Sequence, residues 1–226
     1  MADCTLSLAL TSHLELSSTS EEHFVHNIEV RIEAEDQTSV SEVGFARVIQ
    51  VRIGAAHSAE HSIAALFDAT QDLTNHCFPV VDLETGDWTE AVYKTWDGDV
   101  FDQDLLIIPK LEILPNYRGH DIGLFCMARL IQMLSSGCGL VVIKPFPLQF
   151  DSSYKEYTER RELLGFDQLT ASQADATEKL IKHYKRLGFR ALPGTDLLCL
   201  STSRISVSPE MIGLPEFHEF DLPIRE

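Results

Sequence analysis

Between Leu111 and Phe125 the chain reads Leu-Glu-Ile-Leu-Pro-Asn-Tyr-Arg-Gly-His-Asp-Ile-Gly-Leu-Phe. This stretch leads from an apolar run over residues 105–114, typical of a central strand, into a tight turn. A strongly apolar segment over residues 122–135 follows the turn and predicts a helix. Pro109 interrupts the strand, and because proline cannot donate a ladder hydrogen bond we expect a bulge or break there. The segment therefore predicts a strand, a turn and a helix in direct succession.

The turn itself predicts an anion site. Backbone N–H groups gather at a helix N-terminus, where they and the helix dipole stabilise an anion such as a pyrophosphate. Gly119 and Gly123 permit close approach of the backbone, and Arg118 can either anchor the turn or contact a phosphate. Taken alone, a strand, turn and helix with glycine is common, so the spacing does not establish the site.

The chain before this segment indicates paired strands followed by helices. Apolar and polar residues alternate over residues 28–34, and residues 43–53 return as a second strand, which together predict an antiparallel hairpin. Residues 58–69 predict a helix with Ser58 as its cap, and residues 87–96 a second, shorter helix.

The chain after this segment predicts a short buried strand over residues 140–144 and an amphipathic helix over residues 173–187. Two final strands are expected over residues 189–192 and 197–203. Because helices separated by single strands need crossover connections, the order indicates an α/β fold with a mixed central sheet flanked by helices on both faces.

We expect one domain spanning residues 1–226, because no linker divides the chain. Residues 1–25 are expected to form a variable N-terminal arm, either poorly ordered or with an edge strand near residues 6–10. Residues 204–226 are expected to form a surface tail.

Composition restricts the partners. Lys and Arg number 18 against 35 Asp and Glu, a formal charge of −17, which disfavours nucleic acid and anionic membranes and favours a cationic partner. An acidic surface that only maintains solubility is the alternative. The five cysteines show no paired spacing, so we expect neither a disulfide framework nor a metal site. Without a secretory signal or a long apolar run, a cytoplasmic protein is expected.

Two segments resemble one family. The run from Pro115 to Gly123 resembles the acetyl-CoA loop of the GNAT acetyltransferases, whose pattern is Gln/Arg-x-x-Gly-x-Gly/Ala. Arg118 and Gly123 match the first and last positions, whereas Asp121 stands at the middle glycine. This carboxylate would either weaken pyrophosphate binding or act as a helix cap. The second segment, residues 178–189, resembles the family's tyrosine helix, with Tyr184 and the following Gly-Phe in register.

The resemblance covers residues 105–200 and implies the GNAT fold, in which two parallel strands splay apart around the acetyl-pantetheine arm. It implies acetyl-CoA as co-substrate and a cofactor site made by one set of residues: Ile113, Leu114, Arg118, Gly119, His120, Asp121, Ile122 and Gly123. Backbone groups of Ile113 and Leu114 would hold the acetyl carbonyl. Tyr184 would protonate the departing thiolate.

The expected activity is transfer of an acetyl group to a primary amine, small or peptide-borne and cationic. Glu112, beside the cofactor slot, is the candidate base that accepts the amine proton, and a solvent-facing strand carboxylate is the alternative. The long connection over residues 146–172 is expected to shape the acceptor pocket. A non-catalytic acyl-CoA-binding or regulatory module of the same fold is the second hypothesis, and a homodimer is compatible with either.

Overall fold

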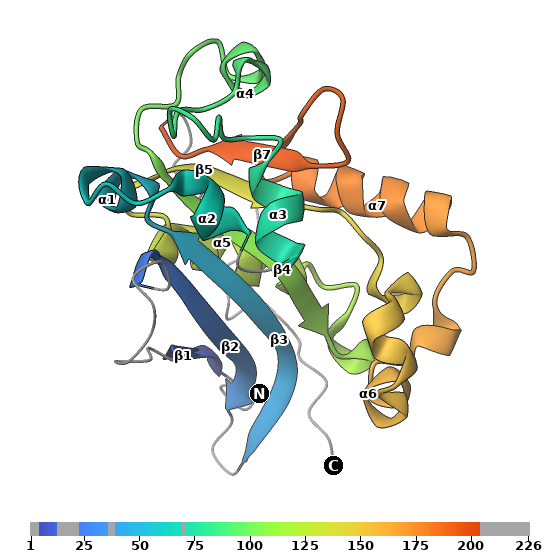
Figure 1. Cartoon of the computed structure of the whole chain (residues 1–226). Helices are drawn as coiled ribbons and strands as arrows, with labels where there is room; N and C mark the ends of the chain where they lie inside the picture. The colour runs from blue at the N-terminus through green and yellow to red at the C-terminus, as the bar shows by residue number, and fades with distance from the viewer. Residues whose placement is uncertain (1–4, 13–22, 36–38, 69–70, 204–226) are drawn as a thin grey trace.

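The structure is a computed structural model, and it describes residues 5–12, 23–35, 39–68 and 71–203. These residues form a seven-stranded sheet in the order β1-β2-β3-β4-β5-β7-β6 (Figure 1). The strands are β1 (Thr5–Ser12), β2 (Val25–Glu35), β3 (Val40–Val51), β4 (Asp104–Ile113), β5 (Cys138–Ile143), β6 (Arg190–Ala191) and β7 (Leu198–Ser201). Among the strands of the described residues, only β4 and β5 pair in parallel, and every other pair is antiparallel. A mixed α/β fold is therefore confirmed.

The predicted hairpin is confirmed as β2 and β3, which pair over their whole lengths with a register shift between Ile32 and Glu33. On β2 the side chains of Val30 and Ile32 are fully buried while their neighbours are not, as the alternation predicts. Of the two alternatives for the N-terminal arm, the edge strand near residues 6–10 is confirmed, because β1 lies at the edge of the sheet and pairs with β2. The predicted tail over residues 204–226 lies outside the described residues.

The single helix expected over residues 58–69 is wrong. The chain instead forms three short helices, α1 (Ile53–Ser58), α2 (Ile63–Phe67) and α3 (Gln71–Cys77). Ser58 ends α1, and the cap belongs to Ser62, whose hydroxyl accepts the Ala65 N–H at 3.3 Å. The second predicted helix is present as α4 (Glu90–Thr95).

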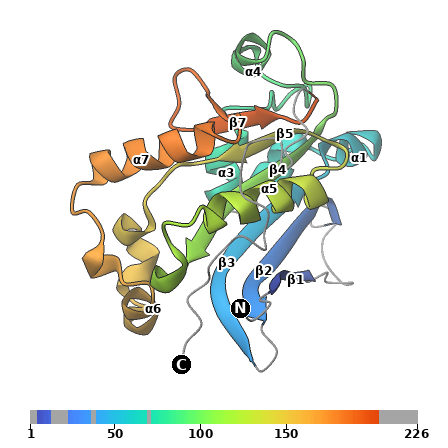
Figure 2. The same cartoon turned by 180° about the vertical axis from the view of Figure 1, so that it is seen from behind.

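Helices cover both faces of the sheet. In Figure 1, α2 and α3 lie in front of the strands, and in Figure 2 the opposite face carries α5 (Ile122–Leu134). The buried side of α5 packs on β4, and Gly137, with φ +80°, follows the helix where the chain turns into β5. The last long helix, α7 (Gln173–Lys185), precedes β6.

The break predicted at Pro109 is confirmed as a bulge. Arg47 on β3 pairs with Lys110, whereas Ile49 pairs with Ile107, so that Ile108 and Pro109 together oppose one residue of β3. On its other edge, β4 pairs with β5 only from Asp104 to Ile107. Beyond the bulge the two parallel strands separate, while β4 continues to Ile113.

The long connection between β5 and α7 is built from short elements. They are the 3-10 turns η3 (Leu148–Phe150), η4 (Ser152–Lys155) and η5 (Phe166–Gln168), and the helix α6 (Thr158–Leu163). Tyr154, Leu164 and Phe166 form a small buried cluster of their own. Both views place α6 at the carboxyl end of β4 (Figures 1 and 2). We call residues 144–172 the insert.

Candidate functional site

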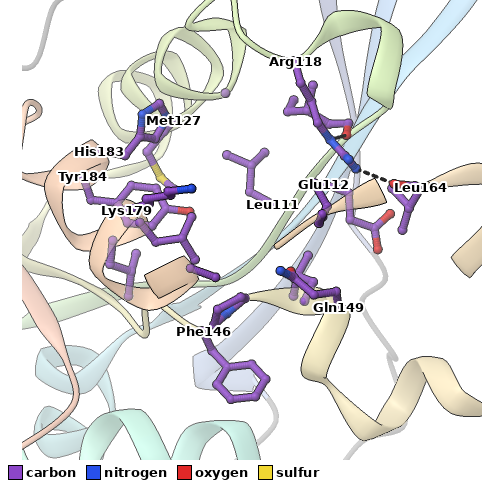
Figure 3. A pocket seen from close by; sticks show the side chains of 18 of the residues that line it. Leu111, Glu112, Arg118, Met127, Phe146, Gln149, Leu164, Lys179, His183 and Tyr184 are labelled. Atoms are coloured by element: carbon purple, nitrogen blue, oxygen red, sulfur yellow. Dashed lines mark hydrogen bonds between the residues drawn. The ribbon is translucent and has the colours of Figure 1, made fainter. Parts of the chain in front are cut away.

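The separation of β4 and β5 opens into a cavity of about 600 Å³. Its walls come from the second half of β4, the turn and first helical turn of α5, the end of β5, the insert, and α7 (Figure 3). Segments distant in the sequence thus meet at one place. Residues of the predicted anion-binding loop, among them Arg118 and Gly123, line this cavity together with Tyr184.

Within the described residues, the second half of β4 has no strand partner on the edge that faces the opening. Leu114 donates its N–H to the Val43 carbonyl at 2.8 Å, so it is committed to β3. Backbone groups alternate in direction along a strand. The N–H groups of Leu111 and Ile113 therefore both point away from β3, on the side opposite to the Leu114 N–H, and towards the opening. The expectation for Ile113 is compatible with this geometry, whereas the Leu114 N–H is not available to a ligand because it is bonded to Val43.

Arg118 braces the turn. Its Nε donates to the Ile113 carbonyl at 2.7 Å, and a terminal guanidinium nitrogen donates to the Leu164 carbonyl at 2.8 Å (Figure 3). The side chain therefore ties the end of β4 to the insert. Of the two roles considered for Arg118, the structure shows the anchor.

Asp121 adopts a left-handed backbone conformation, with φ +57° and ψ +11°. Such a conformation favours glycine and is tolerated by Asp and Asn, so Asp121 keeps the backbone shape that a glycine would supply. Its side chain makes no capping hydrogen bond, and the suggested capping role is wrong. The carboxylate instead binds Arg186, which follows α7, through two N–O contacts of 2.6 Å. These hydrogen bonds lower the pKa of Asp121.

The first turn of α5 faces the cavity through Ile122 and Gly123. The first N–H groups of a helix have no partner within it, so they are available to an anion. A Cβ on Gly123 would lie 3.5 Å from the Ile113 side chain, which shows how closely the helix approaches β4. Gly119, with φ +83°, also lines the cavity, whereas His120 is exposed and outside its lining.

Tyr184 lies on the cavity side of α7. Its ring contacts the rings of Phe189 and His183, with centroid separations of 6.3 and 5.8 Å. Burial raises the pKa of Tyr184 to about 12, so the phenol keeps its proton at neutral pH. Within the described part of the chain its hydroxyl has no hydrogen-bond partner, which leaves the proton available to a bound molecule.

Glu112 is neither the free base nor the solvent-facing carboxylate that the sequence left open. Its side chain is 1% exposed and accepts hydrogen bonds from the Tyr154 hydroxyl and from Arg160, and Lys110 lies 2.9 Å away. Burial would raise the pKa of Glu112, but these three partners outweigh it and hold the pKa below its ordinary value. A carboxylate with every partner in place and a lowered pKa is a poor proton acceptor.

Sequence reasoning missed His183, Lys179 and Met127, all of which line the cavity (Figure 3). Burial lowers the pKa of His183, so its imidazole is neutral at pH 7. Helical spacing could have identified the α7 pair, because residues 176, 179, 180, 183 and 184 share one face. Met127 lies one turn after Gly123 on α5.

In the part of the chain that the structure places, no group of three or more His, Cys, Asp or Glu side chains could hold a metal ion. Within those same residue ranges, no helix has both the length and the apolar character that crossing a membrane demands.

Comparisons with protein-family models, with curated proteins and with solved structures found no match for this chain.

Proposed function

We propose that this chain is an acetyl-CoA-dependent N-acetyltransferase of the GNAT type. One observation carries the proposal: a single cavity joins the opening between two parallel strands, the N-terminal turn of α5 and the Tyr184 phenol. The two motifs that resemble the family lie 65 residues apart in sequence at Gly119 and Tyr184, and they line the same cavity.

The walls of the cavity offer complementary groups to the parts of acetyl-CoA. Backbone N–H groups at the start of α5 suit a pyrophosphate, and the free edge of β4 suits the amide-bearing pantetheine arm. The N–H groups of Leu111 and Ile113 point to the opening, where they would polarise the thioester carbonyl. Arg118 supports this edge by binding the Ile113 carbonyl.

The reaction is a direct transfer. The neutral amine attacks the thioester carbonyl carbon, a C–N bond forms, and the C–S bond breaks. The thiolate takes the proton of the Tyr184 hydroxyl, and the amine releases one proton. His183, which is neutral and adjacent to Tyr184, is the group suited to accept that proton, directly or through water.

The second hypothesis, a non-catalytic acyl-CoA-binding module, rested on the carboxylate of Asp121. In the structure Arg186 neutralises this carboxylate, so the argument for lost pyrophosphate binding is weaker. One observation still favours the module. Glu112 is hydrogen-bonded to Tyr154 and Arg160, so the expected carboxylate base is not free to accept a proton.

The test is a pair of measurements on the purified chain. Selective binding of acetyl-CoA to the native state must raise the thermal midpoint, and adenine nucleotides alone serve as the control. Release of free thiol is then followed with a panel of primary amines. Stabilisation with amine-dependent thiol release supports the enzyme, and stabilisation without release supports the module. No stabilisation at millimolar acetyl-CoA contradicts both.

A further inference from the structure

The acceptor side of the cavity has an apolar wall supplied by the insert. Side chains of Phe146, Leu148, Leu164, Phe166 and Leu169 line it. Leu164 and Phe166 are buried and belong to the cluster around Tyr154, so this wall is part of a packed structure. Arg118 and the Glu112 network fasten it to β4.

The acidic side chains of the cavity lining are both occupied. Glu112 and Asp121 are the acidic residues among the described residues of the lining. Glu112 is bound by Lys110 and Arg160, and Asp121 is bound by Arg186. A second positive charge on a bound molecule would therefore find no carboxylate awaiting a partner in this lining.

The cavity also carries positive side chains. Arg118 and Lys179 line it, and in Figure 3 the Lys179 amine extends into the cavity. Lys144 lines it too and is paired with Asp196 at 2.7 Å. The formal charge of −17 thus describes the chain as a whole and does not extend into the cavity.

We infer that the acceptor is a primary amine on an apolar body with no second positive charge, an inference that rests on the proposed acetyl transfer. This inference differs from the cationic acceptor that the net charge favours. Apolar surroundings disfavour an ammonium ion. Binding against the apolar wall of the cavity therefore lowers the pKa of the amine and supplies the neutral nucleophile. The nitrogen then attacks the thioester carbon, loses its proton, and the thiolate leaves with the Tyr184 proton.

The test compares pentylamine with cadaverine, two amines of equal chain length of which only cadaverine carries a second ammonium group. Thiol release from acetyl-CoA is measured with each. We expect kcat/KM for pentylamine to exceed that for cadaverine by about tenfold or more, because the second ammonium group of cadaverine finds no free carboxylate in the cavity lining. Equal values, or a preference for cadaverine, would overturn the inference and leave the proposed activity standing.

A charge-introducing variant makes the comparison specific to the insert. Leu169 lines the cavity and is 36% exposed, so Leu169→Glu should fold and place a free carboxylate beside the bound amine. We expect it to shrink the preference for pentylamine about tenfold. Leu163→Glu is the matched control, because Leu163 is 47% exposed, lies on the same insert and does not line the cavity. An equal effect of both variants would contradict the assignment.

A longer acyl chain is the competing occupant of the apolar wall. If hexanoyl-CoA is used better than acetyl-CoA and the preference between the two amines vanishes, the wall holds the acyl group and the inference is wrong. Absence of thiol release with every amine would overturn the proposed function and this inference together.

Discussion

Arg186 and Asp121 form a two-point ion pair that joins the end of α7 to the start of α5, with both N–O contacts at 2.6 Å. The pair connects the loop that we propose binds pyrophosphate with the helix that carries Tyr184. Arg186 also neutralises a carboxylate that would otherwise face the proposed anion site. The pair thus explains how an aspartate is accommodated at a position where a neutral glycine would be expected.

Removing Arg186 should weaken cofactor binding. Arg186→Ala leaves the Asp121 carboxylate without Arg186 beside the proposed anion site, and we expect the Kd for acetyl-CoA to rise about tenfold. In the double variant Asp121→Gly/Arg186→Ala the carboxylate is gone as well, and affinity should return towards that of the wild type. Glycine suits the φ of +57° at this position, so the double variant should fold.

The control for this pair is Lys182→Ala, which removes a cation from α7 that pairs with the exposed Glu178. Isothermal titration of acetyl-CoA should show no change for it. If the double variant binds as weakly as Arg186→Ala, Arg186 contacts the cofactor itself and does not act through Asp121.

Tyr184→Phe should lower turnover while leaving acetyl-CoA affinity nearly intact. In the proposed reaction the phenol supplies the proton for the thiolate, and a positioned general acid contributes about 100-fold or more to the rate. Steady-state kinetics and titration of acetyl-CoA measure the two effects separately. Tyr93→Phe removes a hydroxyl from an exposed tyrosine on α4 and should leave both unchanged. Unaltered turnover in Tyr184→Phe would remove this residue from the mechanism.

Glu112→Gln should destabilise the protein more than it slows the chemistry. The variant leaves Arg160 and Lys110 without their buried counter-charge, and we expect a loss of about 2 to 4 kcal/mol in the free energy of unfolding. Urea titration measures this loss, and Glu178→Gln, at an exposed helical pair, should show no measurable change. A stable Glu112→Gln protein with kcat reduced about 100-fold would instead identify Glu112 as the base.

The effect of Glu112→Gln on the free energy of unfolding should depend on pH. Because the pKa of Glu112 is lowered in the folded state, its stabilising contribution is complete above the ordinary value of 4.5. The contribution is lost as the pH falls through the lowered value. The difference in unfolding free energy between wild type and Glu112→Gln should therefore be constant near neutral pH and shrink below about pH 4.5. A constant difference down to pH 3 would contradict the shift.

His183→Asn should alter the acid side of the pH–rate profile. Burial lowers the pKa of His183, so the imidazole is neutral and able to accept a proton down to below its ordinary value of 6.5. We expect the wild-type kcat to fall only below that pH, and the variant to be slower with no such fall. His57→Asn, an exposed histidine on α1, is the control. A variant that keeps the wild-type profile would exclude His183 as the acceptor.

The sequence predicted the sheet well where burial alternates or is continuous. The alternation of β2, the continuous apolar run of β5 and the bulge at Pro109 each follow from local rules. The segment between β3 and β4 was predicted less well. The chain breaks between α1 and α2 near His61, and Ser62 caps α2, whereas the sequence was interpreted as one helix over residues 58–69.

The candidate site was predictable where one motif defines it and not where distant segments meet. Tyr184 and residues 118–123 other than His120 line the cavity, as their resemblance suggests. The partner of Asp121 is 65 residues away, and the partners of Glu112 lie in the insert, at Tyr154 and Arg160. No spacing in one sequence reveals contacts of this kind, because the folded chain creates them.

The bulge at Ile108 and Pro109 and the insert differ in how well they tolerate a change in chain length. Deleting one residue at the bulge would restore a continuous register with β3 and leave Leu111 opposite Ala46, but it would remove the bulge beyond which β4 and β5 separate. The insert is a series of short turns with its own small cluster, and it could lengthen at its exposed bends without disturbing the sheet. A change of length after β5 would therefore reshape the cavity wall and leave the sheet unchanged, whereas a deletion at the bulge would alter the opening between β4 and β5.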